Sequence, residues 1–395
     1  MTAASAKRVR VGFVVGQLGT GWIGGLNYLS NLLASIASLS DRQIETVLLV
    51  APEDAIEAAK RFDADQVVTT RMVLPRGRRR MAGMVTQRLL GRNLTLEWLA
   101  RRYMIDVFTH VPPTGTRSPL KVISWIPDFQ YLRLPDLFSS QDRTTRDRGH
   151  RAIVDQATTI VLSSHDARGD LLARYPEAEP RARVLQFVSG LGYAGTQRAK
   201  SELAADYGLD RPWLHVPNQL WKHKNHRAVI DALGLLRRNG LAPLVVCTGS
   251  TDDFRHPGFF EEIKAHIAAQ NVTDNFRVLG LVPYADVTAL MHHAVAVINP
   301  SLFEGWSTTV EEAKSTGKRI LLSDIPVHRE QAPPRATFFS PENPAELAAA
   351  IKQSLDEHDP ATEQRAAFEA AATLPKRLHT FAETYQAVVL DTVRR

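Results

Sequence analysis

Short apolar runs bounded by turn residues alternate with helix-length amphipathic stretches along the whole chain of 395 residues. This alternation is typical of parallel sheets, because two parallel strands need a connection long enough to hold a helix. The expected strands lie at residues 9–15, 45–50, 107–109, 122–126, 159–162, 183–188, 213–217, 244–247, 276–279, 294–298, 319–322 and 337–339. The sequence therefore predicts an α/β protein in which helices cover the faces of parallel sheets.

The alternation is interrupted over residues 190–212, where apolar residues become sparse before the strand pattern resumes. We interpret this stretch as a linker, which predicts domains at residues 1–195 and 196–376 and one further helix within residues 377–395. The other helices that we expect in detail lie at residues 26–38, 225–239, 258–270, 285–292 and 309–316. Two open α/β domains in tandem place a ligand in the cleft between the carboxyl ends of their strands.

The composition, with 44% hydrophobic and 23% charged residues, is that of a globular protein and excludes a wholly disordered chain. A single cysteine, Cys247, allows no internal disulfide and favours a reducing compartment. No apolar stretch approaches the roughly 18 residues that a membrane-spanning helix needs. The first apolar run has no cleavage site after it, so we interpret it as a strand and not as a signal peptide. We therefore expect a cytoplasmic protein, with no nucleic-acid partner.

The positive charge of the chain is concentrated in one segment. Between Arg71 and Arg102, nine arginines stand against one acid, Glu97, and methionines and leucines are interleaved with them. Such a segment suits peripheral contact with the inner face of an anionic membrane, or with an anionic acceptor. A solvated loop and helix face is the alternative, because runs of charge are usually solvated.

The glycines from Gly19 to Gly24 match the G-x-G-x-x-G pattern of dinucleotide-binding proteins. With Glu53 or Asp54 as the ribose-binding acid, an NAD-dependent oxidoreductase becomes an alternative function. The pattern does not directly follow the first strand, however, and the acids come about 30 residues further on instead of about 20. A simpler interpretation is that Gly24 and Gly25, before the next helix, let backbone N–H groups approach an anion.

Two carboxylates flank the start of a helix in the second half of the chain. Glu304 lies in a loop after an expected strand, and Glu312 lies about one turn inside the helix, with its side chain directed back toward the loop. The free N–H groups of the helix start could hold a phosphate. They belong to Gly305, Trp306, Ser307 and Thr308. Two carboxylates beside an anion site suit a ligand with hydroxyls on both sides of a diphosphate, which describes a nucleotide sugar.

The run FEGWSTTVEEA resembles the E-x7-E motif of the retaining GT-B glycosyltransferases of family 4, the glycosyl transferases group 1. Further matches are GGLNYLSNLL, IPDFQYLRLPDLFS, SSHDARGDLLARYP, PNQLWKHKNH, LGLVPYADV and SDIPVHREQ, in the family's order and over most of the chain. The resemblance implies two Rossmann-like domains that face an interdomain cleft. The first would bind the acceptor and the second the nucleotide sugar, and the C-terminal helix would return to the first domain.

The same resemblance implies roles in the second domain. Glu304 would bind hydroxyls of the donor sugar, Glu312 the ribose hydroxyls, and the amides of residues 305–308 would lie near the sugar and diphosphate. Lys224 would stabilise the diphosphate leaving group, whose negative charge grows in the transition state. The arginine that the family commonly has five or six residues earlier is replaced here by Gln219 or Asn218, and Lys222 is the candidate to supply the missing charge.

In the first domain, His110 and Asp128 each follow an expected strand. By the resemblance, His110 would contact the donor sugar, and a buried structural histidine is the alternative. Asp128 is a candidate base for the acceptor's proton, although the leaving phosphate can take that role in a front-side mechanism. The neighbouring histidines at 223 and 226, and at 292 and 293, have no third ligand at suitable spacing, so we expect no metal site.

The sequence thus predicts a retaining, metal-independent glycosyltransferase that uses an NDP-sugar as a substrate and needs no cofactor. The acceptor would be a saccharide or a lipid-linked saccharide, in the synthesis of a surface polysaccharide or glycoconjugate. A non-catalytic relative that only binds nucleotide sugars is a further alternative. The complete set of Glu304, Glu312 and Lys224 argues against it, and the missing arginine argues for it.

Overall fold

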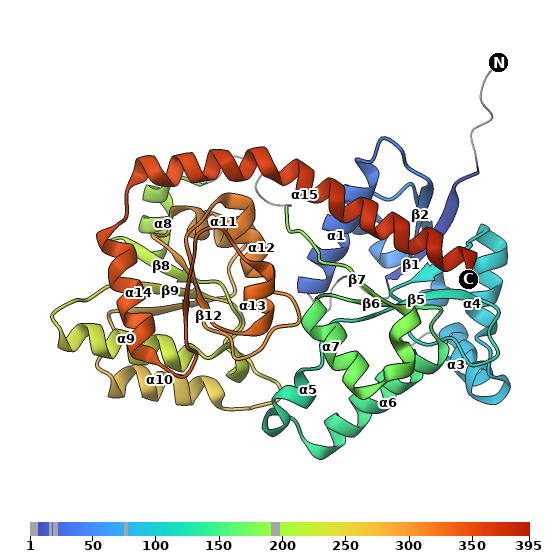
Figure 1. Cartoon of the computed structure of the whole chain (residues 1–395), viewed down its shortest axis with the longest axis horizontal. Coiled ribbons are helices and arrows are strands. Elements are labelled where there is room, and N and C mark those ends of the chain that lie inside the picture. Colours follow the sequence, from blue (N-terminus) through green and yellow to red (C-terminus); the bar gives the residue numbers. More distant parts are fainter. Residues whose placement is uncertain (1–6, 16–17, 19–22, 75–77, 191–197) are drawn as a thin grey trace. The chain divides into compact units, whose positions relative to one another are not determined.

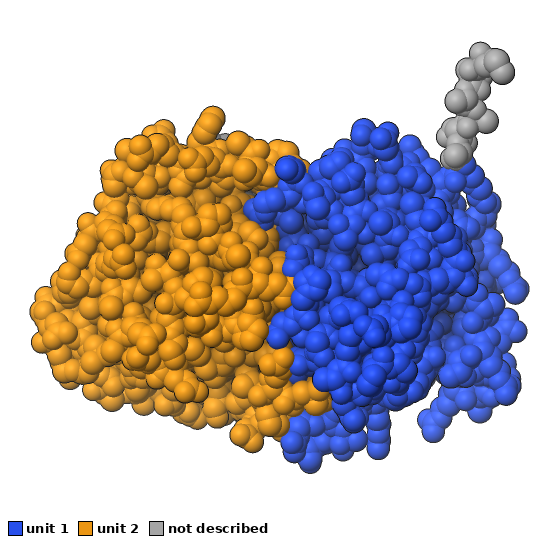
Figure 2. Space-filling model, viewed as in Figure 1, with its two compact units in different colours: residues 1–129, 140–188, 376–395 blue, residues 130–139, 189–375 orange. Residues whose placement is uncertain are grey.

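The computed structural model describes residues 7–15, 18, 23–74, 78–190 and 198–395. The predicted domain boundary at residue 195, and Gly19 and Gly21 of the glycine pattern, lie outside these ranges. The chain forms two compact units, coloured separately in Figure 2. Unit 1 comprises residues 1–129, 140–188 and 376–395, and unit 2 comprises residues 130–139 and 189–375.

Unit 1 is built on one seven-stranded sheet of order β3-β2-β1-β4-β5-β6-β7, in which the pairings are parallel. The strands are β1 (Val9–Val15), β2 (Ile44–Val50), β3 (Gln66–Thr69), β4 (Val107–Thr109), β5 (Lys121–Ile126), β6 (Thr159–Leu162) and β7 (Ala182–Val184). Because β1 pairs with both β2 and β4, the order of the strands reverses beside β1. This is where open α/β sheets bind ligands.

The helices of unit 1 connect these strands (Figure 1). They are α1 (Ile23–Ala37), α2 (Ala55–Arg61), α3 (Arg78–Leu90), α4 (Leu94–Tyr103), α6 (Ser140–Gln156) and α7 (His165–Arg174), with short 3-10 turns at Pro52–Asp54, Arg71–Val73 and Pro176–Arg181. The second part of α15 (Pro360–Arg394) also belongs to this unit. Tyr385 of α15 is fully buried beside Phe13 of β1, which fixes the end of the chain to the sheet.

Unit 2 is built on a six-stranded parallel sheet of order β10-β9-β8-β11-β12-β13. The strands are β8 (Trp213–Val216), β9 (Leu244–Thr248), β10 (Phe276–Gly280), β11 (Val297–Asn299), β12 (Ile320–Ser323) and β13 (Ala336–Phe339). The helices are α5 (Gln130–Arg133), α8 (Lys200–Tyr207), α9 (His226–Arg238), α10 (Phe259–Ala269), α11 (Tyr284–His293), α12 (Thr308–Thr316), α13 (Pro326–Gln331), α14 (Pro344–Asp356) and the first part of α15, with 3-10 turns at Pro135–Leu137 and Lys222–Lys224.

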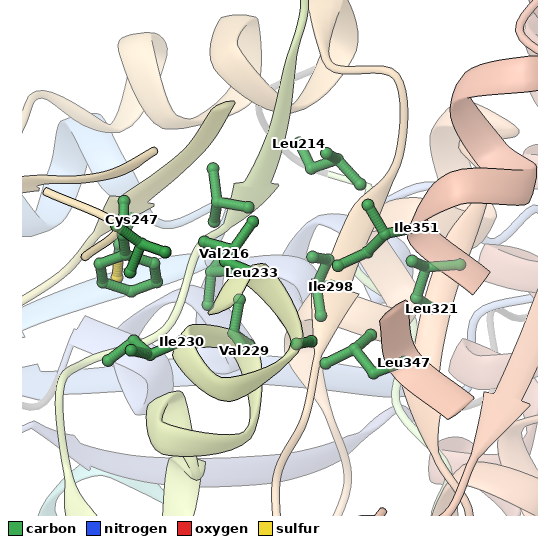
Figure 3. Close-up of a cluster of buried hydrophobic side chains, with 14 of the residues drawn as sticks. Leu214, Val216, Val229, Ile230, Leu233, Cys247, Ile298, Leu321, Leu347 and Ile351 are labelled. Atoms are coloured by element: carbon green, nitrogen blue, oxygen red, sulfur yellow. The ribbon is translucent and has the colours of Figure 1, made fainter. Parts of the chain in front are cut away.

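Helices cover both faces of this second sheet. In Figure 1, β8 and β9 lie between α9 with α10 on one side and α8 with α11 on the other. Figure 3 shows the packing of one face, where Val216 and Ile298 of the sheet meet Leu233 of α9 and Ile351 of α14. The four inner strands, β8, β9, β11 and β12, are buried on both faces, which explains their continuous apolar sequences. The predicted α/β class with two parallel sheets is confirmed.

The element bounds differ from the prediction at several places. The strand expected at 183–188 ends at Val184, because its only neighbour, β6, ends at the paired Leu162. The strand expected at 294–298 begins at Val297, and Ala294 instead caps α11, with its N–H bonded to the Leu290 carbonyl. The edge strand β3 was not predicted, and the last helix begins at Pro360, well before the predicted range of 377–395. Among the described residues, no helix is both long and apolar enough to cross a bilayer.

Candidate active site

The loop between β11 and α12 in unit 2 is fixed at both ends by side-chain hydrogen bonds. Ser307 is the N-cap of α12, and its hydroxyl accepts a hydrogen bond from the N–H of Val310. The Asn299 amide, at the end of β11, donates to the same hydroxyl over 2.8 Å. Gly317 ends the helix with φ +68°, a conformation that favours glycine. These contacts hold the loop that carries Glu304 in one position at the carboxyl end of β11.

Lys224 and Glu304 form a short ion pair. The Lys224 Nζ lies 2.6 Å from Glu304 Oε1, and their side chains are 16% and 11% exposed. The Ser301 hydroxyl donates to the same carboxylate oxygen over 2.7 Å. Burial raises the pKa of the Glu304 carboxyl, but Lys224, the nearby His328 and the two hydrogen bonds together hold it below its usual value. Glu304 is therefore ionised at neutral pH and paired with a cation 80 residues away in the chain.

Glu312 has a very different environment, although it lies only two turns further along the chain. It is 5% exposed, and the Tyr284 hydroxyl, at the start of α11, donates to its Oε1 over 2.7 Å. Burial raises the pKa of the Glu312 carboxyl to about 7, against the smaller opposite effect of the Tyr284 hydrogen bond. Near neutral pH this carboxyl is divided between its two protonation states, and it can accept further hydrogen bonds when ionised.

The adjacent Glu311 is hydrogen-bonded to other side chains of the protein. It accepts hydrogen bonds from Lys314 over 3.3 Å and from the Gln331 amide over 3.0 Å. Gln331 also accepts the N–H of Ser307 over 3.0 Å. The prediction that the Ser307 N–H is free for a phosphate is therefore wrong, because this N–H already donates a hydrogen bond to Gln331. Gly305, Trp306 and Thr308 are half-buried on the same turn.

Asn218 joins the ends of two strands to the start of α12. Its amide donates to the Asn299 side chain over 3.3 Å and accepts from the Thr309 hydroxyl over 3.2 Å. Gly249, at the end of β9, has φ +137°, and a Cβ there would lie 2.7 Å from the Asn218 carbonyl oxygen. Asn218 thus connects the ends of β8 and β11 to the first turn of α12. The neighbouring Gln219 is half-buried, and its carbonyl accepts the N–H of Trp221 over 2.8 Å.

A buried arginine was missed by the sequence reasoning. Lys222, the predicted source of extra positive charge, is exposed, and its backbone N–H bonds to the Asp253 carboxylate over 3.1 Å. Arg255, in the same loop as Asp253, is 10% exposed and lies 3.4 Å from His223 Nδ1. Its guanidinium also lies over the Trp221 ring, 5.3 Å from the centroid. Because Arg255 follows a different strand, spacing around Lys224 could not indicate it.

His110 in unit 1 lies at the end of β4 with a left-handed backbone, φ +56°. Its Nε2 lies 2.9 Å from the Tyr28 hydroxyl and its Nδ1 2.8 Å from the Thr109 hydroxyl. The ring stacks on Phe13 and makes a tilted contact with Trp125. Burial lowers the pKa of His110 to about 4, so the imidazole is neutral at pH 7.

Asp128 follows β5, the strand beside β4, and is half-buried. His110 and Asp128 therefore lie at the same edge of the first sheet, where the strands end. The two glycines predicted before the helix, Gly24 and Gly25, instead lie in the first turn of α1, which begins at Ile23. A Cβ at Gly24 would meet no atom of the described residues within 4 Å.

Comparison with known proteins places unit 2 in a family. Residues 205–374, which contain Lys224, Glu304 and Glu312, match the glycosyl transferases group 1. This part of the chain is a glycosyl transferase group 1 domain. The chain is therefore a glycosyltransferase, and the oxidoreductase alternative is not favoured. No curated protein sequence matches the chain.

Solved structures show that the likeness in fold extends over both units. A glycosyltransferase from Rickettsia africae covers 99% of this chain and all of its own, with a TM-score of 0.68 at 14% identity. Alr3699/HepE from Anabaena, in complex with UDP-glucose, covers 97% of this chain and all of its own, with a TM-score of 0.64 at 15% identity. WaaG, a glycosyltransferase involved in lipopolysaccharide biosynthesis, covers 98% of both chains, with a TM-score of 0.57 at 13% identity. The fold of this glycosyltransferase is GT-B.

Proposed function

We propose that this glycosyltransferase moves a sugar from an NDP-sugar to a saccharide or lipid-linked acceptor with retention of configuration, in the synthesis of a surface polysaccharide or glycoconjugate. The main support is the partly buried Lys224–Glu304 ion pair in the loops that follow β8 and β11, with Glu312 on the helix that follows the second loop. Unit 2 binds the donor in this proposal, and unit 1 binds the acceptor.

Lys224 is the group that stabilises the departing diphosphate. Its ammonium is partly buried, and an electrostatic contact is worth more there than in water. As the bond to the sugar breaks, negative charge grows on the diphosphate oxygen and strengthens its attraction to Lys224. Glu304, held by Ser301 beside this cation, is placed to accept hydrogen bonds from sugar hydroxyls. This assignment needs no metal, because Lys224 supplies the positive charge.

Glu312 accepts the two ribose hydroxyls of the nucleotide in this proposal. A carboxylate has two oxygens with free lone pairs, and a ribose diol presents two donors at a matching separation. Tyr284 uses one lone pair of Oε1 and fixes the orientation of the carboxyl plane. The UDP-glucose complex of the Anabaena relative supports a UDP-sugar as the first donor to test.

In unit 1, His110 and Asp128 are proposed to act on the side of the acceptor and the sugar. Both ring nitrogens of His110 have hydrogen-bond partners inside the unit, the hydroxyls of Tyr28 and Thr109. These bonds hold the ring in place, and we propose that it lies beside the sugar in its neutral form. Asp128 is the proposed base for the acceptor's proton. The leaving phosphate remains the alternative base, and an Asp128→Asn variant with normal turnover would favour the phosphate.

The acceptor side of unit 1 is proposed to make peripheral contact with the inner face of an anionic membrane. The helix α3 exposes large apolar side chains: Met81 is 56%, Met84 61%, Val85 53% and Leu89 75% exposed. They lie within the arginine-rich segment, and such a surface combines apolar insertion with attraction to anionic lipid. Contact with a membrane would bring the enzyme to a lipid-linked acceptor.

The proposed function is tested first by donor binding. Thermal unfolding of the full chain is measured with a panel of UDP-, GDP- and ADP-sugars, because a ligand that binds only the native state raises the unfolding temperature. We expect one nucleotide to raise it in the wild type and to have a much smaller effect in Glu312→Gln. If no member of the panel stabilises the wild type, the assignment of a nucleotide-sugar donor fails.

A further inference from the structure

Two neighbouring hollows in unit 1 are lined by residues of α3 and α6. One has a volume of about 370 Å³ and the other about 540 Å³. They share three lining residues, Met84 and Gln87 of α3 and Gln156 of α6, so they are neighbours, and we refer to the two together as the trough. His110 and Asp128 line neither hollow, although Val111, next to His110 in the chain, lines the smaller one.

The smaller hollow is mainly apolar. Its walls include Val14 near the end of β1, Met72 and Leu96, and the Val111–Pro113 segment that follows β4. Its volume falls within the roughly 300 to 1,000 Å³ range of small-molecule sites. An aliphatic chain of moderate length is the kind of group that such a wall accommodates, because burying it removes apolar surface from water.

The larger hollow is mainly polar and carries positive charge. Arg88 of α3 and Arg117 of the loop before β5 both line it, and Arg80 lines the apolar hollow. Neither hollow is lined by an aspartate or glutamate among the described residues. Within the part of the chain that the structure describes, Arg88 and Arg117 form no ion pair with an acidic side chain. The planar guanidinium of arginine can donate two parallel hydrogen bonds to oxygens of a phosphate, which makes arginine a favoured partner of this anion.

A glycine helps to keep the apolar hollow open. Gly149 lies in the interior of α6, where glycine is unfavourable compared with alanine. It lines the hollow, and a Cβ built on it meets no heavy atom within 4 Å. Gly149 is exposed at the rim of the hollow, so a larger side chain there has room and would narrow the entrance in our proposal. Gly169, in the interior of α7, has the same open surroundings but does not line either hollow.

We propose that this trough binds the phosphate-bearing end of a single-chain lipid, with the chain in the apolar hollow and the phosphate between Arg88 and Arg117. The neighbouring apolar and cationic hollows match the two halves of such an amphiphile. The site is separate from the donor residues of unit 2, so it does not depend on the proposed transfer reaction. It gives the chain a specific lipid contact in addition to the exposed surface of α3.

Isothermal titration of the full chain with decyl phosphate, kept below its micelle concentration, tests this site. Inorganic phosphate and the uncharged decyl maltoside are titrated separately as head and chain controls. We expect saturable binding of decyl phosphate to one site, at least about tenfold tighter than binding of inorganic phosphate or decyl maltoside. Absence of saturable binding, or equal affinity for inorganic phosphate, would overturn the proposal.

A glycine variant with its matched control, and an arginine double variant, show where the ligand binds. Gly149→Leu should weaken decyl phosphate binding at least about tenfold, whereas the matched control Gly169→Leu should bind like the wild type. Arg88→Gln with Arg117→Gln should weaken binding of decyl phosphate and leave any weak binding of decyl maltoside unchanged. Unchanged binding in Gly149→Leu, with its fold verified by circular dichroism, would show that the ligand lies elsewhere. Nucleotide binding, measured on the same samples, reports independently on the donor site.

Discussion

The protonation of Glu312 gives a quantitative prediction for nucleotide binding. Its pKa is raised to about 7 by burial, and a ribose diol can donate two hydrogen bonds only to the ionised form. With this pKa, about one tenth of the carboxyl is ionised at pH 6 and about nine tenths at pH 8. Since apparent affinity scales with the competent fraction, the nucleotide Kd should be about tenfold higher at pH 6 than at pH 8.

The same carboxyl should lower the stability of the unliganded protein at high pH. Its pKa in the folded state is about 7, above the ordinary value of 4.5. Between these two values the folded state binds more protons at Glu312 than the unfolded state, so the contribution of this carboxyl to stability is greatest below pH 4.5 and is lost as pH rises to 7. A shift of this size corresponds to about 3 kcal/mol. Glu312→Gln should therefore raise the free energy of unfolding by up to about 3 kcal/mol at pH 8, while weakening nucleotide binding.

Calorimetric titration with the nucleoside diphosphate from pH 6 to pH 8, and denaturant unfolding over the same range, measure both effects. The diphosphate has its own titration, so the wild type is compared with Glu312→Gln at each pH. We expect the variant to lose the part of the pH dependence that belongs to the protein. Parallel binding curves for the two proteins, or a variant that is less stable at pH 8, would refute this account of Glu312.

Three further predictions concern the donor site and the membrane. Lys224→Ala should lower kcat roughly 100-fold, the scale of losing one preorganised charge, whereas Lys222→Ala should have a smaller effect because its side chain is exposed. EDTA should leave the turnover of the wild type unchanged, and a loss of activity that added metal restores would contradict the role given to Lys224. At low salt, the wild type should co-sediment with anionic vesicles but not with neutral ones. The double variant Met81→Ser/Leu89→Ser should lose this binding. The matched control Phe368→Ser, at a residue that is 77% exposed on α15, should keep it.

The regular part of the fold could be predicted from the sequence because buried parallel strands leave continuous apolar runs. The strands at Val107–Thr109 and Thr159–Leu162 have the predicted bounds. The edge strand Gln66–Thr69 escaped prediction because it is short and has exposed residues at both ends. Edge positions need less apolar surface, so their sequences carry a weaker signal.

The residues of the site could be predicted in part. Glu304, Glu312 and Lys224 stand in recognisable runs, but the 2.6 Å contact between Lys224 and Glu304 depends on two strands meeting side by side. Side-chain partners from other elements left no local signal. Tyr284 and Gln331 belong to this group: the first sets the environment of Glu312, and the second occupies the Ser307 N–H. Tertiary packing, not spacing, decides such contacts.

Cleavage of the donor is the most direct test of the central claim. The full chain is incubated with the NDP-sugar that stabilises it most, and release of the nucleoside diphosphate is followed together with the anomeric configuration of the transferred or hydrolysed sugar by NMR. The account predicts release of the diphosphate, retention of configuration at the sugar carbon, and a loss of roughly 100-fold in rate for Lys224→Ala. Inversion of configuration, or release at an unchanged rate in Lys224→Ala, would contradict it.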